Sequence, residues 1–130
     1  MSEISPERID RGFAQFVQMV GDERANEVRA QWRDVSPEFE QFVMGSLSGE
    51  MWTRPDLDLR TRSLITIAAL AALGRPRGLA LNIEMALRNG ATRAEVRETL
   101  LHMGFYAGFP AAWEGLQTAA EVFQRLDEEG

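Results

Sequence analysis

The strongest pattern in the chain is an apolar run over residues 64–73, in which Thr66 is the only residue that is not hydrophobic. Asp58 can cap a helix ahead of this run, and Gly74 can take the left-handed torsion that closes one. Pro76 suits the first turn of a second helix directly afterwards. We therefore predict an antiparallel helical hairpin at the centre of the fold. Its first helix has no face suited to water, so it should be buried within its assembly.

Apolar residues also recur at spacings of three and four on both sides of the hairpin, as they do along one face of a helix. Two Ser-Pro-Glu segments and a Thr-x-x-Glu capping box mark helix starts. No segment shows the period-two alternation of a strand. We therefore predict an all-α fold, a single-domain helical bundle over residues 1–130 with about six or seven helices. The helices outside the hairpin are expected over residues 6–20, 22–33, 92–106 and 110–126, with a further helix that starts at residue 37 and ends near residues 45 to 49.

Two details of this prediction concern aromatic side chains. The last helix is expected to pack Trp113, Leu116, Ala120 and Phe123. Residues 49–55 are expected to form an extended or turning connection, because the residue before a proline disfavours helical torsions. That connection would place Glu50 and Trp52 on a loop, where Trp52 either plugs the edge of the core or lines a binding site.

Charge and composition exclude several classes of partner. The net charge is −6 and the hydrophobic fraction is 45%, so the chain has no basic footprint for nucleic acid or anionic lipid. The acidic N-terminal segment does not look like a secretory signal, and the longest apolar run is shorter than the roughly 20 residues that span a bilayer. We expect a cytoplasmic protein with no nucleic-acid or membrane partner.

The residue types present limit the chemistry further. The chain has no Cys, and all 14 basic residues are Arg, so thiol chemistry and a lysine Schiff base are excluded. His102 and Tyr106 are the only His and Tyr. One imidazole and scattered carboxylates do not form a closed metal shell, so we expect no metal. Acid–base catalysis would depend on Asp, Glu, these two side chains or the substrate itself.

The first candidate for chemistry is the row formed by Glu98, His102 and Tyr106, which lie at spacings of four on one predicted helix. A carboxylate one turn from an imidazole can fix its tautomer and raise its basicity, which suits a proton shuttle. The alternative is an exposed Glu–His pair that contributes only to the stability of the helix. The sequence leaves both interpretations open.

The second candidate is Asn82 together with Glu84, in the second helix of the hairpin. An amide in a crevice of low dielectric can donate to a developing oxyanion, although it cannot transfer protons. The alternative is an amide that satisfies a nearby backbone carbonyl.

The third candidate is a mouth for a substrate carboxylate, formed by Glu50 and Trp52 of the predicted loop with Arg60 and Arg62. Two arginines near the positive end of a helix dipole are unfavourable unless they meet an anion or a carboxylate. Asp56 and Asp58 are the alternative partners, since surface arginines usually pair with nearby acids.

Two longer segments carry a family resemblance. The run GEMWTRPDLDLRTRSLITIAALAALGR, followed by ALRNGATRAEVRETLLHMGFYAGFPAAW, resembles the carboxymuconolactone decarboxylase family, in its decarboxylase branch more than its alkylhydroperoxidase branch. The resemblance covers roughly residues 36–123. It implies an all-α protomer of the alkylhydroperoxidase-like type that assembles as a homotrimer or homohexamer, with active sites near subunit contacts. It also implies decarboxylation of a small lactone acid without a cofactor, in the breakdown of aromatic compounds.

The chain departs from this family at two places. The alkylhydroperoxidase branch carries a Cys-x-x-Cys pair where this chain has Arg75 and Gly78, so peroxide reduction by that route is excluded. Decarboxylase members usually carry a histidine where this chain has Asn82.

The resemblance gives each candidate a role in one reaction. Loss of carbon dioxide from a lactone acid would leave a dienolate, which needs donors at its oxygen, a dry pocket and a proton donor. On this hypothesis Asn82 is the oxyanion donor, His102 or Glu50 is the acid, and Arg62 anchors a substrate carboxylate. Trp52, Glu84 and Tyr106 would complete the substrate-binding residues.

Two further interpretations stay open. The loss of the family histidine could mark a protein retuned for isomerisation, cyclisation or lactone rearrangement of another small acid or natural-product intermediate. The chain could also be a non-catalytic oligomeric binding protein, because a fold alone does not imply activity. Convergence of Asn82, His102 and Glu50 on one cavity would favour the enzyme interpretations.

Overall fold

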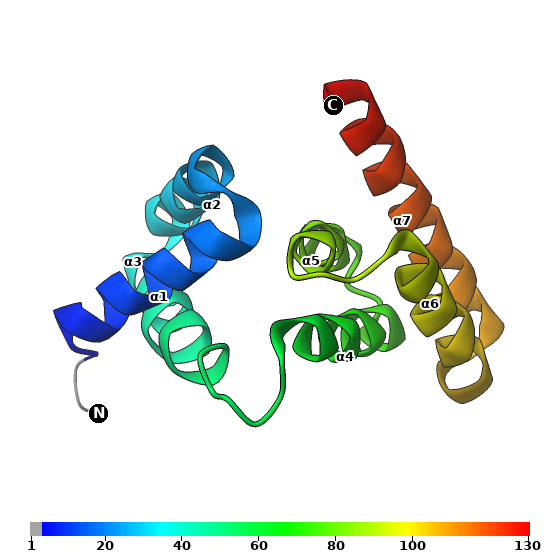
Figure 1. Cartoon of the computed structure of the whole chain (residues 1–130), viewed down its shortest axis with the longest axis horizontal. Helices are drawn as coiled ribbons and strands as arrows, with labels where there is room; N and C mark the ends of the chain where they lie inside the picture. The colour runs from blue at the N-terminus through cyan, green and yellow to red at the C-terminus, as the bar shows by residue number, and fades with distance from the viewer. Residues whose placement is uncertain (1–3) are drawn as a thin grey trace. The chain divides into compact units, whose positions relative to one another are not determined.

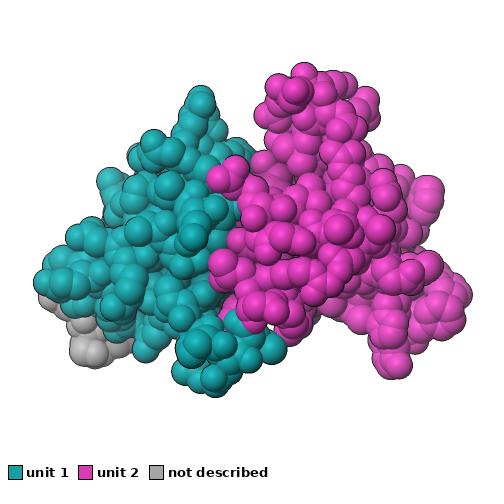
Figure 2. Space-filling model, in the orientation of Figure 1, with its two compact units in different colours: residues 1–57 teal, residues 58–130 magenta. Residues whose placement is uncertain are grey.

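A computed structural model describes residues 4–130; the first three residues of the acidic N-terminal segment lie outside this part. Over these residues the chain forms seven α-helices and one π-helix, with no strand, which confirms the all-α prediction (Figure 1). The chain divides into two compact units, residues 1–57 and residues 58–130 (Figure 2). The helices of each unit pack on one another, and the single domain over residues 1–130 stays a prediction.

Unit 1 contains the helices α1 (Pro6–Val20), α2 (Asp22–Val35), α3 (Pro37–Phe42) and the π-helix η1 (Val43–Met51). Both Ser-Pro-Glu segments start helices as predicted. Ser5 accepts a hydrogen bond from the backbone N–H of Arg8 at 3.3 Å, and Ser36 accepts one from Phe39 at 3.1 Å. These hydroxyls satisfy backbone donors that the first turn of a helix leaves free.

The predicted connection over residues 49–55 is confirmed from Trp52 onward, where the chain turns without a helix or strand. It is wrong at its start, because η1 continues to Met51 and carries Glu50 on a helix. The reason is a contact between backbones. A Cβ atom on Gly12 of α1 would lie 1.6 Å from the carbonyl oxygen of Met44, and one on Gly49 would lie 2.6 Å from that of Arg8. The glycines of η1 therefore serve close packing rather than helix termination, and this tertiary contact overrides their local preference.

A buried carboxylate also holds unit 1 together. Glu40 of α3 accepts hydrogen bonds on Oε1 from Arg29 Nε at 3.2 Å and from Arg33 Nη2 at 2.8 Å. Glu40 is buried, whereas Arg33 is exposed and Arg29 is partly exposed. A buried charge needs such partners, because an unpaired carboxylate away from water is strongly destabilising.

Unit 2 contains the predicted hairpin and two further helices: α4 (Leu59–Leu73), α5 (Pro76–Arg88), α6 (Arg93–Ala107) and α7 (Phe109–Glu129). Gly74 closes α4 with φ of 68°, as its position predicts. Asn89, at the end of α5, donates from Nδ2 to the buried hydroxyl of Ser63 in α4 at 2.9 Å. The hairpin is therefore confirmed, and a polar contact between its two helices satisfies the hydroxyl of Ser63.

The core of unit 2 is built from side chains of all four helices. The buried members are Ile67, Ala71, Leu79, Ile83, Ala86, Ala91, Val96, Leu100, Ala119, Val122 and Phe123. Helix α4 contributes one buried face, while Ile65 and Leu73 on other faces are exposed. The helices of unit 2 therefore do not bury α4 on all sides. Burial of those residues by other protomers stays a prediction.

The predicted inner face of α7 is partly wrong. Phe123 is buried and Leu116 is partly buried, but Trp113 and Ala120 are exposed. The inner face instead carries Ala112, Gly115 and Ala119. A Cβ atom on Gly115 would lie 2.8 Å from Leu100 Cδ2, so only a small residue lets α7 approach α6 this closely.

Candidate functional site

Asn82 lies in the second turn of α5 and is partly buried. Its Nδ2 donates to the backbone carbonyl of Gly78, four residues earlier, at 2.8 Å. This is the alternative that the sequence left open, an amide that satisfies a backbone carbonyl. An amide nitrogen carries two N–H groups, so this bond occupies only one of its two donors.

Glu84, two residues further along α5, is largely buried and forms an ion pair with Arg125 of α7 at 3.2 Å between Oε1 and Nη2. The pair joins the hairpin to the last helix of the unit. Glu84 therefore has a structural partner. The sequence analysis did not identify Arg125, because it lies 41 positions after Glu84 in the chain.

His102 and Tyr106 project from α6 into solvent, and their rings stack with centroids 5.1 Å apart and an angle of 28° between planes. Over residues 4–130 no ion pair joins His102 to Glu98, which is exposed one turn before it. The predicted row therefore exists on one face of α6. The contact that it makes is between the two rings and not between the carboxylate and the imidazole.

At the start of α4, the ion pair that Arg60 forms is with an acid from another helix and not with Asp56 or Asp58. Arg60 forms an ion pair with Glu95, the acid of the capping box that starts α6. Asp58 is occupied as the cap of α4 and accepts from the backbone N–H of Thr61 at 2.7 Å. Hydrogen bonds from Thr61 hold the pKa of Asp58 below its ordinary value. Arg62 is partly buried in the same turn.

The two remaining candidates, Glu50 and Trp52, belong to unit 1. Trp52 is buried, as the core-anchor interpretation expects. Glu50 is exposed on η1 and accepts from Arg8 Nη2 of α1 at 2.5 Å, while the same nitrogen lies 3.5 Å from the hydroxyl of Ser46. The sequence analysis missed Arg8, since only the packing of α1 on η1 brings it beside Glu50.

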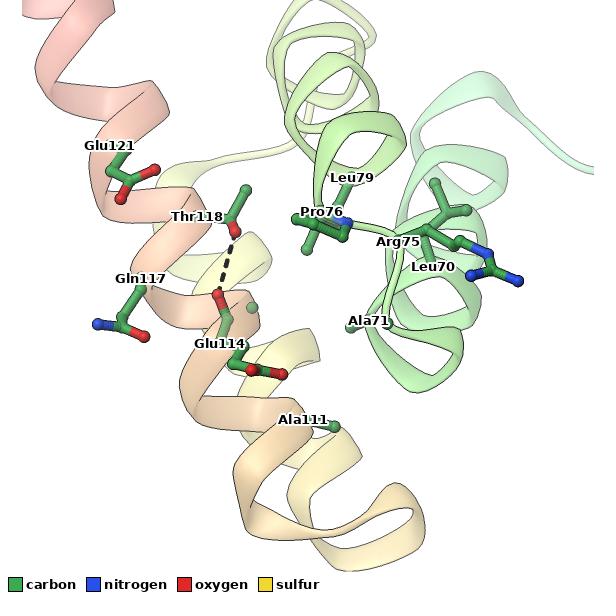
Figure 3. Close-up of a pocket in the computed structure, with 12 residues that line it drawn as sticks. Leu70, Ala71, Arg75, Pro76, Leu79, Ala111, Glu114, Gln117, Thr118 and Glu121 are labelled. Carbon is green, nitrogen blue, oxygen red and sulfur yellow. Dashed lines mark hydrogen bonds between the residues drawn. The ribbon is translucent and has the colours of Figure 1, made fainter.

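Unit 2 also has an open pocket of about 430 Å³ between the hairpin turn and α7. In Figure 3 the carboxylate of Glu114 points toward the hairpin, whereas the guanidinium of Arg75 points away from α7. Glu121 also lines the pocket, and neither Asn82 nor His102 does. The carboxylates of Glu114 and Glu121 would repel an acidic ligand in this pocket. The pocket therefore lacks the positive charge that the predicted acidic substrate requires.

Two negative findings apply to residues 4–130. No group of three or more His, Asp and Glu side chains there is arranged to hold a metal ion. None of the helices described is both long enough and apolar enough to cross a membrane.

Comparison with known proteins identifies the family of this chain. The model of the carboxymuconolactone decarboxylase family matches residues 37–121. The chain is 36% identical over 120 residues to 4-carboxymuconolactone decarboxylase of Acinetobacter baylyi, which covers 92% of this chain and 90% of that protein.

Two shorter matches have a similar level of identity. An uncharacterised 15.0 kDa protein of Paracoccus denitrificans is 38% identical over 84 residues, 62% of each chain. Nitrosuccinic acid decarboxylase of Metarhizium robertsii is 32% identical over 82 residues, which cover 63% of this chain and 57% of that protein. Because the family model matches more than half of the chain and the first relative is matched over nearly its whole length, this protein belongs to the carboxymuconolactone decarboxylase family.

Proposed function

We propose that the protein is a decarboxylase that acts, without a cofactor, on a small carboxylated lactone of the 4-carboxymuconolactone type. The observation that carries this proposal is the 36% identity over 92% of the chain to a relative of that name. We also propose that it works in the cytoplasm as a homotrimer or homohexamer. The exposed apolar residues Ile65 and Leu73 on α4 support self-association, since apolar surface left open on one chain favours contact with another.

The proposed reaction breaks the bond between the substrate and its carboxylate and releases carbon dioxide. The electron pair of that bond moves into the lactone carbonyl and gives a dienolate, and a proton then adds to carbon. The protein must stabilise the negative oxygen, supply the proton and exclude water, which would otherwise weaken each electrostatic contact.

In this proposal Asn82 is the residue that stabilises the oxygen. Its bond to the Gly78 carbonyl fixes the direction of the amide and leaves a second N–H for the dienolate. A donor that is already oriented needs no reorganisation when charge develops, which is why such donors lower barriers.

The other candidates have roles around this centre. His102 supplies the proton, and Arg62 holds a substrate carboxylate. Tyr106 offers ring surface to the lactone, whereas Trp52 is buried in the core of unit 1. Glu84, which pairs with Arg125, contributes by fixing the helix that carries the amide.

A second candidate function is decarboxylation or rearrangement of another small acid. Asn82, in place of the family histidine, favours it, because an amide stabilises an oxyanion but transfers no proton. The Metarhizium relative is named for nitrosuccinic acid. A nitro group can accept the electron pair of a departing carboxylate, as a lactone carbonyl can, so nitrosuccinate is a suitable second substrate for the test.

The experiment measures carbon dioxide release from 4-carboxymuconolactone and from nitrosuccinate by the wild type, Asn82→Ala and Asn82→His. We expect wild-type release from the lactone and a loss of about 100-fold or more in Asn82→Ala, the usual effect of removing one oxyanion donor. Asn26→Ala is the matched control, because Asn26 makes the same bond to a carbonyl four residues earlier, at 2.9 Å, on an exposed face of α2.

Each result assigns the function. If Asn82→His releases carbon dioxide from the lactone and the wild type does not, the result would favour the retuned enzyme. If the wild type releases carbon dioxide from nitrosuccinate and not from the lactone, nitrosuccinate would be its substrate. No release from either acid by wild type and Asn82→His would overturn decarboxylation.

A further inference from the structure

One asparagine of the chain is followed by glycine, namely Asn89 at the end of α5. Asparagine is thermolabile, because the backbone nitrogen of the next residue can attack its side-chain carbonyl carbon. A glycine in that next position has no Cβ and leaves the nitrogen open. Asn26 and Asn82 instead precede Glu27 and Ile83, whose backbone nitrogens are engaged inside helices α2 and α5. Asn89 is therefore the asparagine at which this attack meets the least hindrance.

The backbone at Gly90 is open to solvent and is held less firmly than its neighbours. Gly90 is exposed, has φ of 104°, and a Cβ built on it would meet nothing within 4 Å. Its nitrogen lies 3.3 Å from the carbonyl oxygen of Leu87, outside the usual range of about 2.7 to 3.2 Å. The N–H groups of Asn89 and Ala91, on either side, bond carbonyls at 2.8 and 2.9 Å. The nitrogen of Gly90 is therefore the least restrained of the three.

The side chain of Asn89, in contrast, is restrained by a contact with another helix. Its Nδ2 donates to Oγ of Ser63 in α4 at 2.9 Å, and Ser63 has an exposed fraction of 0%. While this bond is formed, the carboxamide is directed to α4 and not to the nitrogen of Gly90. Breaking the bond leaves a buried hydroxyl without its partner, which costs more than breaking a bond in water.

We propose that Asn89–Gly90 is a site of spontaneous deamidation, and that the bond from Asn89 to Ser63 sets its rate. This inference is independent of the proposed function. The nitrogen of Gly90 loses its proton to solvent base and bonds to Cγ of Asn89, while the Cγ–Nδ2 bond breaks and the amide leaves as ammonia. The resulting succinimide takes up one water, and either of its two ring C–N bonds breaks. The products are aspartate, with the original backbone, and isoaspartate, in which the backbone runs through the former side chain.

Either product loosens the hairpin of α4 and α5. A carboxylate at position 89 has no N–H to donate to Ser63. It also places a negative charge at the C-terminal end of α5, where the helix dipole is negative as well. Isoaspartate in addition lengthens the backbone by one carbon atom in the turn that Gly90 makes. The hairpin therefore weakens as the chain ages.

Peptide mapping measures the modification, because cleavage after arginine separates the three asparagines of the chain. Asn89 falls in the fragment 89–93, whereas Asn82 and Asn26 fall in the fragments 78–88 and 25–29. The purified protein is kept at mildly alkaline pH and body temperature. Mass spectrometry and an isoaspartyl methyltransferase assay then follow each fragment over weeks. In the wild type we expect deamidation of the fragment with Asn89 and no change in the other two.

Ser63→Ala removes the acceptor, and the rate at Asn89 should rise about threefold to tenfold, the factor that one hydrogen bond gives to an equilibrium. Thr66→Ala is the matched control, because it removes a hydroxyl of α4 that bonds a carbonyl of its own helix, at 2.8 Å. Val122→Ala is the control for stability, since it opens a cavity in the core of unit 2 from α7. Circular dichroism checks the folding of each variant. If Ser63→Ala does not fold, Ser63→Cys replaces it, because sulfur is a weaker acceptor.

Faster deamidation at Asn89 in the Ser63 variant alone would support both parts of the inference. If the fragment with Asn89 stays as unchanged as the one with Asn82, in the wild type and in the Ser63 variant, the site is overturned. An equal rate in the wild type and the Ser63 variant, or an equal rise in Val122→Ala, would overturn the role of the bond. Asn89→Asp supplies one product directly, and its urea midpoint should lie below that of the wild type. An unchanged midpoint would contradict the loosening of the hairpin.

Discussion

The two units of this protein are held together by different means. In unit 1, α1 lies against η1 so closely that backbone meets backbone at Gly12 and Gly49, and the Ser48 hydroxyl donates to the Gly12 carbonyl at 2.5 Å. In unit 2, large side chains such as Ile83 and Leu100 fill the space between helices. A side-chain core can adjust to a change of volume by moving rotamers, whereas touching backbones cannot.

The difference extends to charge. The buried carboxylate of unit 1, Glu40, is held by two arginines, and its Oε2 has no hydrogen-bond partner in residues 4–130. The largely buried carboxylate of unit 2, Glu84, pairs with Arg125 at the side of an apolar core. Unit 1 therefore depends on backbone contact and a buried carboxylate with two partners, and unit 2 on a side-chain core with one close approach of helices at Gly115.

The strongest test of this difference between the two units is to add one methyl group to each. Gly12→Ala is expected to lower the free energy of unfolding by about 3 kcal/mol or more, because its Cβ would lie 1.6 Å from a backbone oxygen that must move. Gly78→Ala is expected to raise it by about 0.5 to 1 kcal/mol, since its Cβ meets only Leu70 methyl groups at 3.7 and 3.8 Å. Urea unfolding followed by circular dichroism measures both.

Hydrogen exchange then locates the change. The loss in Gly12→Ala should appear as faster exchange in residues 6–51. Equal destabilisation by the two alanines would show that the units do not differ in the way their contacts indicate.

The second prediction concerns the buried charge of unit 1. Glu40→Gln keeps the shape of the side chain but removes the charge that Arg29 and Arg33 bond, and it is expected to cost about 2 kcal/mol. Glu38→Gln, on an exposed side of the same helix, should change stability by less than about 0.5 kcal/mol. Thermal and urea unfolding of the two variants give the difference, and a value near zero for Glu40→Gln would mean that the ion pairs only offset their own desolvation.

The fold was predictable where the signal is local. Helix starts at Ser5, Ser36 and Thr92, and the hairpin turn at Gly74, follow from residues within four positions of each other. The continuation of η1 to Met51 was not, because Gly49 looks like a helix terminator until Gly12 of another helix is placed against it.

The candidate site was predictable only in part. The ring pair of His102 and Tyr106 follows from their spacing on one helix. The partners of Glu50 and Glu84, Arg8 and Arg125, come from other helices 42 and 41 positions away, and no local pattern connects them. Contacts of this kind need the packing of helices, which periodicity indicates but does not specify.

The third prediction concerns the N-caps, which should contribute equally to the stability of the two units. Thr92→Ala in unit 2 and Ser36→Ala in unit 1 each remove an N-cap hydroxyl, and each should cost about 1 kcal/mol. The corresponding glycine variants should cost only a few tenths of that, because glycine adopts cap torsions and lets water reach the donors. A cost confined to one unit would show that the contribution of a cap depends on the packing around it and not only on its own hydrogen bond.

The smallest expected effect is a dependence on acid that belongs to unit 2. The hydrogen bond and charge of Arg93 hold the pKa of Asp127 below its ordinary value, and bonds from Thr61 do the same for Asp58. A carboxyl whose folded-state pKa is lowered stabilises the fold fully above its unfolded pKa, near 3.9, and loses that contribution as the pH falls through the folded value.

Asp58→Asn keeps a capping oxygen and Asp127→Asn keeps the shape, but neither titrates. The double variant should therefore show a flatter decline in the free energy of unfolding below about pH 4 than the wild type. Both aspartates are exposed, so the change is modest and should shrink further in high salt. If the slope of stability against pH were the same in both proteins, the acid response would have to come from carboxylates other than Asp58 and Asp127.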